Sequence, residues 1–341
     1  MRYLLLIFTI LVLLCACGGP VNEFKASVPR KQEATTPQTW PEDLTILSGP
    51  YGGTWYTLGR TVAVILKNEL IPTKAVSGGG IDNLIKLHTS EADLCLSSAV
   101  LTRPAAYGES PFADSLHNVA RIANLYNQYF YVVVREGYAK ANNIQQLGDL
   151  FSSGTPVRLA ILKPGTVSEY LTRYAFKLYE INYRDIRDAG GEVLYTNYTS
   201  GATFLEKNKI DVFIFTLSAP ASVITSIEKT TAVRILSVEE NIRLQLSREL
   251  GTTTHIIQAG TYKSVKKDTP VIGDYTILAV RRNLPEELVY KLTAVLSQNR
   301  MIIQKVLPNY INFETESALK SSFISIHPGA KRFYKEKGWI K

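Results

Sequence analysis

The sequence predicts an α/β protein with two lobes and a ligand cleft between them. Strand-like and helix-like segments alternate along residues 41–341, a long apolar stretch at residues 119–135 interrupts the alternation, and a second alternating set starts near residue 157. Alternation of this kind is typical of parallel sheets covered by helices. At about 150 residues per domain, this part of the chain is long enough for two lobes.

The first alternating set contains short apolar runs that we interpret as strands, at residues 44–48, 73–77 and 93–97. Helical patterns follow the first two of them, at residues 54–69 and 81–88. The apolar stretch at residues 119–135 is too long for one ordinary strand. We expect either two strands there or one strand that passes from lobe to lobe.

The second set has expected strands at residues 157–162, 193–196, 211–215 and 233–238, separated by helical patterns near residues 167–178, 202–207 and 223–228. A late strand at residues 275–280 returns the chain toward the first lobe. A helix at residues 285–298 begins with proline and has two glutamates in its first turn. We therefore expect lobe one at residues 41–128 plus 255–341 and lobe two at residues 129–254.

The N-terminal residues predict export. Arg2 precedes a short apolar stretch, too short for a membrane span and typical of a signal peptide, expected at residues 1–16. Leu14, Ala16 and Cys17 are arranged as in a bacterial lipobox, so we expect Cys17 to carry a lipid anchor; a cleaved signal without lipid is the alternative. Residues 17–40 are poor in large apolar side chains and are expected to form a flexible tether, or else an arm that docks on the body.

Composition narrows the function. A hydrophobic fraction of 45% predicts a globular body, and a net charge of +8 is compatible with an anionic partner. Export argues against nucleic acid, and the basic residues are scattered. Cys95 is expected to be an inert core thiol.

The ends of the predicted strands carry glycines, hydroxyls and amides. Because ligands of open α/β sheets bind beyond the carboxyl ends of the strands, we expect the binding site there. Thr54 is expected to cap the helix that starts beside it, and helix N-termini bind anions. Neutral donors of this kind can hold a carboxylate. The expected ligand-binding residues are Tyr51, Gly53, Thr54, Trp55, Ser77, Gly79, Asn83, Ser97, Ser98, Thr166, Ser168, Thr216 and Ser218.

Catalytic and metal-binding patterns are missing from the sequence. The four histidines, His88, His117, His255 and His327, have no metal-ligand spacing with one another or with cysteine or carboxylate. No nucleophile elbow, phosphate-binding loop or dinucleotide fingerprint is present. We therefore expect no cofactor, no metal and no enzymatic activity.

Several motifs together resemble the TAXI family, the solute receptors of one class of TRAP transporters. Residues 49–59 read Gly-x-x-Gly-Gly-Thr-Trp-Tyr-x-x-Gly, and residues 77–84 read Ser-Gly-Gly-Gly-Ile-Asp-Asn-Leu. Further segments with this resemblance are residues 166–169, 209–215, 259–262, 284–290 and 327–330. The resemblance covers about residues 44–338.

The resemblance implies a type II periplasmic-binding-protein fold that closes around a small anionic solute, such as a dicarboxylate, a keto acid or an amino acid like glutamate. It implies delivery of this solute to a membrane permease driven by an ion gradient. The chain departs from the family pattern at Ser98, Ala99, Gly80 and Val167, which puts the ligand in doubt. A lipoprotein receptor that signals to a membrane partner without transport is the alternative function.

Overall fold

The computed structural model describes residues 39–308, 319 and 322–341. The expected signal peptide, Cys17 and nearly all of the expected tether lie outside the described residues. Residues 39–341 form one compact unit. None of the described helices combines the length and apolar character needed to cross a membrane.

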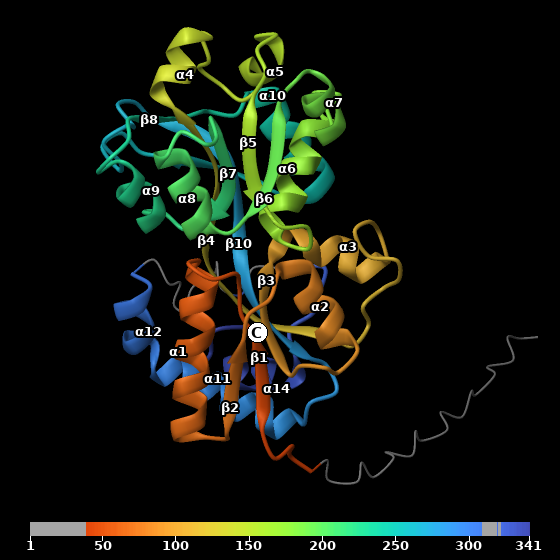
Figure 1. Cartoon of the computed structure of the whole chain (residues 1–341). Helices are drawn as coiled ribbons and strands as arrows, with labels where there is room; N and C mark the ends of the chain where they lie inside the picture. Colours follow the sequence, from red (N-terminus) through yellow and green to blue (C-terminus); the bar gives the residue numbers. More distant parts are fainter. Residues whose placement is uncertain (1–38, 309–318, 320–321) are drawn as a thin grey trace, which may run out of the picture. The chain divides into compact units, whose positions relative to one another are not determined.

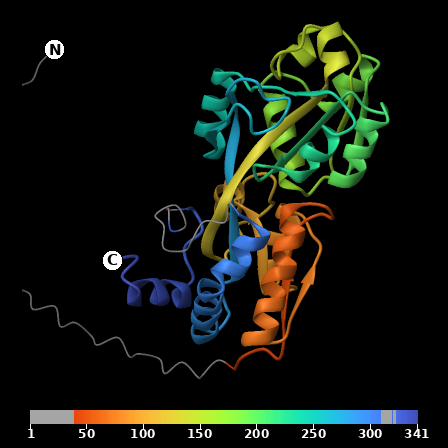
Figure 2. The same ribbon diagram turned by 90° about the vertical axis from the view of Figure 1, so that its left-hand side faces the viewer.

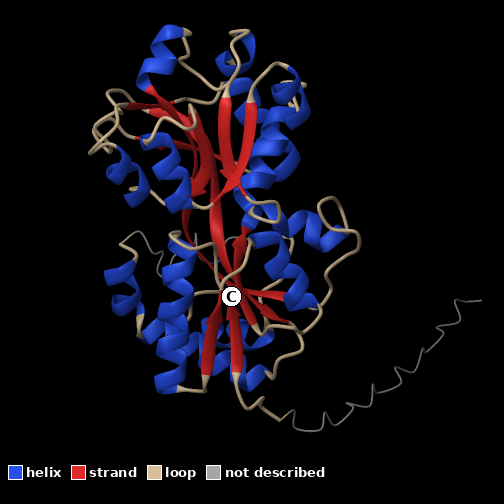
Figure 3. Cartoon of the chain, viewed as in Figure 1, coloured by secondary structure: helices blue, strands red, loops and turns tan. Residues whose placement is uncertain are grey.

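The described strands form one ten-stranded sheet that runs through both lobes. Figures 1 and 3 show it as a continuous set of strands with helices on both sides. Along the sheet the strands follow the order β2 (Thr73–Val76), β1 (Leu44–Leu47), β3 (Leu94–Ser98), β10 (Thr269–Arg281), β4 (Val119–Arg135), β7 (Val212–Leu217), β5 (Arg158–Leu162) and β6 (Glu192–Thr196). Two further strands pair at the side, β8 (Val233–Ile235) with β4 and β9 (Thr253–Ile257) with β10.

Each lobe has its own parallel strands. β2, β1 and β3 are parallel in the first lobe, and β6, β5 and β7 are parallel in the second. The strand-helix alternation in the sequence therefore predicted the fold class correctly, since helical crossovers are needed to join parallel strands.

Two long strands connect the lobes. β4 pairs antiparallel with β10 up to Tyr129 and with β7 from Tyr129 onward. β10 likewise pairs with β9 up to Gly273 and with β3 from Thr276 onward. The expected passage of residues 119–135 between lobes thus takes place as one strand (Figure 2).

The chain returns to the first lobe later than residue 255, the expected boundary. Ile257, Tyr262, Val265 and Val271 are buried in the second lobe's core around Phe213. The polar first residues of β9 gave little sign of this packing, because their side chains are partly exposed. The crossing lies inside β10.

The helices flank the sheet in both lobes (Figure 1). The first lobe contains α1 (Thr54–Glu69), α2 (Gly80–His88), η1 (Ala99–Leu101), α3 (Thr102–Tyr107), α11 (Glu286–Gln298), α12 (Arg300–Val306) and α14 (Pro328–Glu336). The second contains α4 (Glu136–Ala141), α5 (Asp149–Ser152), α6 (Val167–Lys177), α7 (Tyr183–Asp188), α8 (Tyr198–Glu206), α9 (Ser222–Ile227) and α10 (Glu240–Leu250).

Local capping fixes where the helices nearest the strand ends begin. The Thr166 side chain accepts the Glu169 N–H at the start of α6, and the Asn197 side chain accepts the Ser200 N–H at the start of α8. Such caps satisfy backbone donors that have no partner within the helix. α1 has the bounds expected from the sequence. The expected helical segment near residues 202–207 lies largely in α8, which begins at Tyr198.

Cys95 lies in β3 and is fully buried. Burial alone raises the pKa of its thiol, because the charged thiolate would lose its hydration. The expectation of an inert core thiol agrees with this position.

We predict that Gly201→Val destabilises the second lobe. A Cβ atom at Gly201 would overlap the ring of Phe213, which lies in the buried core under α8. Overpacking of this kind costs about 1–3 kcal/mol of unfolding free energy, measurable by denaturant titration. Gly137→Val in α4 is the matched control, because no atom lies within 4 Å of its added Cβ. Equal unfolding midpoints for the two variants would contradict the prediction.

Candidate functional site

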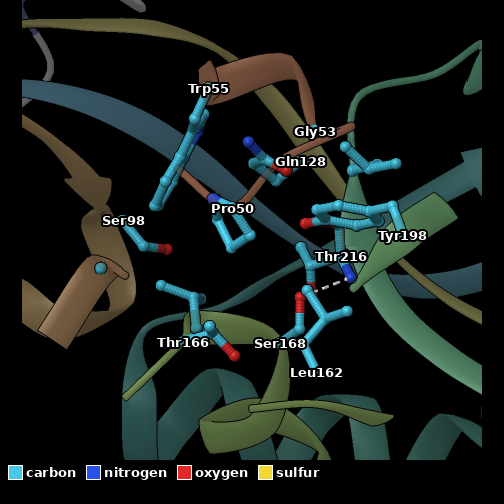
Figure 4. A pocket seen from close by; sticks show the side chains of 13 residues that line it. Pro50, Gly53, Trp55, Ser98, Gln128, Leu162, Thr166, Ser168, Tyr198 and Thr216 are labelled. Atoms are coloured by element: carbon cyan, nitrogen blue, oxygen red, sulfur yellow. Dashed lines mark hydrogen bonds between the residues drawn. The ribbon is translucent and has the colours of Figure 1, made fainter. Parts of the chain in front are cut away.

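A small cavity lies between the lobes, where the strand ends of both lobes face each other. Figure 4 shows it with its lining side chains. The lining residues are Pro50, Gly53, Trp55, Gly80, Ser98, Gln128, Leu162, Thr166, Val167, Ser168, Tyr198, Thr216 and Leu217. Six of the expected ligand-binding residues line it: Gly53, Trp55, Ser98, Thr166, Ser168 and Thr216.

The cavity is narrow. The centres of water molecules can occupy about 20 Å³ of it, and about 10–15 Å³ is needed to hold one water. An organic solute needs more room than this, so the lobes must move apart to hold one.

Helix N-termini converge on this cavity. In the described part of the chain, residues in the first turn of four helices line it: Trp55 of α1, Gly80 of α2, Val167 of α6 and Tyr198 of α8. The partial positive charge of a helix start and its free N–H groups favour an anion. No lysine or arginine among the described residues lines the cavity.

The second lobe contributes a connected group of polar side chains. Ser168 Oγ accepts the Thr216 N–H at 2.9 Å, and the Tyr198 hydroxyl donates to the Thr216 carbonyl oxygen at 2.9 Å. The Thr216 side chain is 6% exposed, and its Oγ1 has no hydrogen-bond partner among the described residues. A buried hydroxyl without a partner is costly and calls for an explanation.

Thr166 differs from these residues because its hydroxyl is already used. Its Oγ1 donates to the Lys163 carbonyl oxygen at 2.7 Å and accepts the Glu169 N–H at 3.3 Å. Thr166 therefore shapes the start of α6 and contributes bulk rather than a free donor to the cavity.

The first lobe and the crossing strands form the opposite wall. Trp55 Nε1–H donates to Thr276 Oγ1 at 2.8 Å, and Gln128 Nε2 donates to the same oxygen. These bonds fix the indole ring and the amide against β10. Trp55 then presents a broad apolar surface with its polar edge already satisfied.

A buried carboxyl group lies directly behind this wall. Ser98 Oγ donates to Asp274 Oδ2, and the Val100 N–H donates to Oδ1 at 3.1 Å. Asp274 is 3% exposed, and burial raises its pKa to about 7. The hydrogen of the Ser98 hydroxyl is therefore directed to Asp274, while Ser98 itself lines the cavity.

Close backbone approach joins the lobes around the cavity. An added Cβ atom at Gly53 would lie 2.6 Å from the Tyr198 ring, and one at Gly79 would lie 2.7 Å from the Gly165 carbonyl oxygen. The Ile81 N–H donates to this same oxygen at 3.1 Å. The glycines of the first lobe thus make room for the second lobe.

Thr54 does not cap α1 as expected. The N-cap is Gly53, and its position has no side-chain cap. Thr54 Oγ1 instead lies 3.2 Å from Ser218 Oγ, so the two hydroxyls form a hydrogen bond between the lobes. The close packing of Gly53 on Tyr198 requires glycine, which displaces threonine to the first helical position.

The remaining predicted site residues lie beside the cavity. Thr54 and Ser218 border one adjoining hollow, and Tyr51, Ser77, Gly79 and Asn83 border another of about 390 Å³, which also contains Lys86 and Lys163. Tyr51 is 63% exposed and packs on Tyr56.

Three of these polar residues hold the loops in place. Asn83 donates to the Ser48 and Leu96 carbonyl oxygens, both at 2.8 Å. Ser77 and Ser97 each donate to a glycine carbonyl oxygen at 2.9 Å.

Sequence reasoning missed Gln128, Tyr198 and Asp274. Gln128 is a polar residue inside an apolar strand, which was a usable signal because buried polar groups need a reason. Asn197 is a typical helix cap, and it could have placed Tyr198 at a helix start. Asp274 carried no local signal, because its role depends on pairing between distant strands.

Metal-ligating groups do not gather in the described residues: no cluster of three or more histidine, cysteine or carboxylate side chains could hold an ion there. His88 and His117 contact each other edge to face, with ring centres 4.5 Å apart. Burial and the neighbouring His117 lower the pKa of His88.

Residues 46–338 match the NMT1-like family. The match covers most of the chain. The chain belongs to the NMT1-like family. This is a family of periplasmic substrate-binding proteins.

Solved structures agree in fold. MatC from Rhodopseudomonas palustris with bound malate is similar with a TM-score of 0.53 and 16% identity, covering 88% of this chain and 98% of that one. PhnD1 from Prochlorococcus marinus in complex with methylphosphonate is similar with a TM-score of 0.51 and 11% identity, covering 88% and 100%. At these identities the likeness establishes the fold, a periplasmic-binding-protein type.

We predict that Asp274 makes stability depend on pH. Its pKa is raised from 3.8 to about 7 in the folded state, so the folded state binds the proton more tightly than the unfolded state. Stability should therefore fall as pH rises from about 4 to about 7, by at most roughly 4 kcal/mol, and stay level above this range. Asp274→Asn should remove this slope in denaturant titrations at several pH values. A slope equal to that of the wild type in the variant would contradict the assignment.

Proposed function

We propose that this protein is an extracytoplasmic receptor that captures a small organic anion between its lobes and delivers it to a membrane permease. One observation carries the proposal: the first turns of four described helices line one cavity that contains an unpartnered buried hydroxyl and no basic side chain. An anion in this position would be held by backbone N–H groups, hydroxyls and helix dipoles. The compound is bound and released without chemical change.

Lobe closure is the capture step in this proposal. The Thr54–Ser218 hydrogen bond and the close approach at Gly53 and Gly79 join the lobes at the edge of the cavity. β4 and β10 are the strands on which the lobes can swing apart. A ligand that contacts both walls stabilises the closed state because the open state lacks half of its contacts.

The transport class is part of the same proposal. The glycine motifs at residues 49–59 and 77–84 resemble those of TAXI-type receptors, so the partner is proposed to be a TRAP permease driven by an ion gradient. A gene for a large multi-span permease beside this one is the expected genomic setting. A neighbouring sensor kinase in its place would point instead to signalling.

Ligand capture is tested by thermal unfolding of the purified protein against dicarboxylates, keto acids and amino acids. A ligand at 100 times its dissociation constant should stabilise the protein by about 2.7 kcal/mol and raise the midpoint by several degrees. The bound compound should be recovered unchanged. A flat response to every organic anion, from protein freed of any bound compound by unfolding and refolding, would overturn the proposal.

Gly53→Val should abolish this response. The valine side chain would meet the Tyr198 ring and hold the lobes apart, while the helix that follows keeps its own packing. Gly137→Val is the control, since its position is open. Binding of wild-type strength in a folded Gly53→Val protein would remove the cavity as the site.

Cys17 is proposed to anchor the protein to a membrane by a lipid. The support is the sequence Leu14-Cys15-Ala16-Cys17 after the apolar stretch. Cys17→Ser should move the protein from the membrane fraction to the soluble fraction of lysed cells, because the lipid attaches to this thiol. If the Cys17→Ser protein stayed in the membrane fraction, the anchor would have to lie elsewhere.

A further inference from the structure

The cavity has a distinct polarity on its two sides. On the first-lobe side, the Ser98 hydroxyl donates to the ionised Asp274 carboxylate, so its oxygen is left as an acceptor toward the cavity. Gln128 Nε2 uses one of its two hydrogens on Thr276, and the amide oxygen Oε1 can accept a further hydrogen bond. This wall therefore offers acceptors for the hydrogen-bond donors of a ligand.

The second-lobe side has the opposite character. α6 and α8 begin there, and the Thr216 hydroxyl is buried, lines the cavity and lacks a partner among the described residues. These groups can donate to one carboxylate. The unpartnered hydroxyl is independent of the helix starts and points to a ligand at the same place.

The space between the two sides is lined mainly by carbon. Pro50, Trp55, Leu162, Val167 and Leu217 contribute apolar surface. A second carboxylate placed here would lose its hydration without gaining a cation, which is costly. It would also approach Asp274, the ionisable group behind the wall.

A ligand ammonium group would gain little from Asp274. Oδ2 is covered by Ser98 Oγ and Oδ1 by the Val100 N–H, and the residue is 3% exposed. The acceptors that face the cavity are therefore neutral. A neutral donor such as a hydroxyl group fits them at a lower desolvation cost than an ammonium group.

We propose that the cavity selects small monocarboxylates with an apolar body and a neutral hydrogen-bond donor, the 2-hydroxy acids being the simplest class, over dicarboxylates, 2-oxo acids and amino acids. Ser98 and Gln128 determine this specificity by contact, and Asp274 is a positioning residue that orients Ser98. The inference rests on the proposed function, because it names the class of anion that the same cavity takes.

Calorimetric titration with four matched probes, at a pH above 7 where Asp274 is ionised, tests the class. The probes are 2-hydroxy-3-methylbutanoate, 2-oxo-3-methylbutanoate, valine and malate. Relative to the first compound, the oxo acid lacks the donor, valine has a charged donor, and malate has a second carboxylate. The hydroxy acid should bind at least tenfold more tightly than each of the others. Equal or tighter binding of any other probe overturns the inference while leaving anion capture intact. If none of the four probes binds but another organic anion does, the inference is also overturned. If no organic anion binds at all, the proposed function is overturned as well.

Asp274→Asn tests the positioning role. The asparagine amide can donate to Ser98, which turns the Ser98 hydroxyl hydrogen toward the cavity and converts the acceptor into a donor. The ratio of the dissociation constants of the oxo and hydroxy acids should fall at least tenfold. Asp188→Asn, at an exposed side chain in α7, should leave the ratio unchanged. An unchanged ratio in folded Asp274→Asn protein overturns the role.

Ser98→Ala provides a second route if Asp274→Asn does not fold. It removes the acceptor itself, so the hydroxy acid should lose its advantage over the oxo acid, while malate gains nothing. An advantage that persists in the Ser98→Ala protein overturns the assignment of Ser98.

Discussion

The antiparallel pairing of β4 with β10 is the constraint on which the rest of the structure depends. The two strands are hydrogen-bonded to each other from Val119 to Tyr129 and each continues into the second lobe with a different partner. The parallel strands of both lobes attach to this pair, so its twist sets the distance between their strand ends. The same pair carries the binding wall, because Gln128 and Asp274 are partners in its register. Any change in the angle between the lobes would therefore move Gln128 and Asp274 in this wall.

Much of this arrangement was predictable from local patterns in the sequence. The alternation of strands and helices gave the fold class, and glycines after residues 48 and 77 located the region where the lobes meet. What local patterns lacked was the reason for the glycines. Gly53 and Gly79 were expected to contact a ligand, and the structure adds that they make room for the other lobe. Asp274 and Ser98 are 176 residues apart, and their contact follows from strand order, which no short window of sequence contains.

The expected residues divide by what their polar groups already contact. Asn83, Ser77 and Ser97 spend their hydrogen bonds on carbonyl oxygens of neighbouring loops, so they hold backbone in place. The Thr216 hydroxyl has no hydrogen-bond partner among the described residues, and Asp274 orients the Ser98 hydroxyl. From residue type alone, all these side chains were expected to be ligand donors. The structure distinguishes them by how many hydrogen bonds each already makes within the protein. Similarity to MatC and PhnD1 concerns the fold alone; the proposed choice of ligand depends on the side chains of the wall.

The contacts that join the lobes and the side chains that face the ligand are largely different residues. Glycine backbone and the Thr54–Ser218 pair form the seam, whereas Leu162, Val167, Leu217 and Gln128 form the wall. Under the proposed function, ligand recognition and lobe movement can therefore be changed separately. Residues of the wall could be substituted to bind a new compound while the closing movement is kept. A pair of fluorophores placed across the seam would then show binding of that compound as a change in energy transfer.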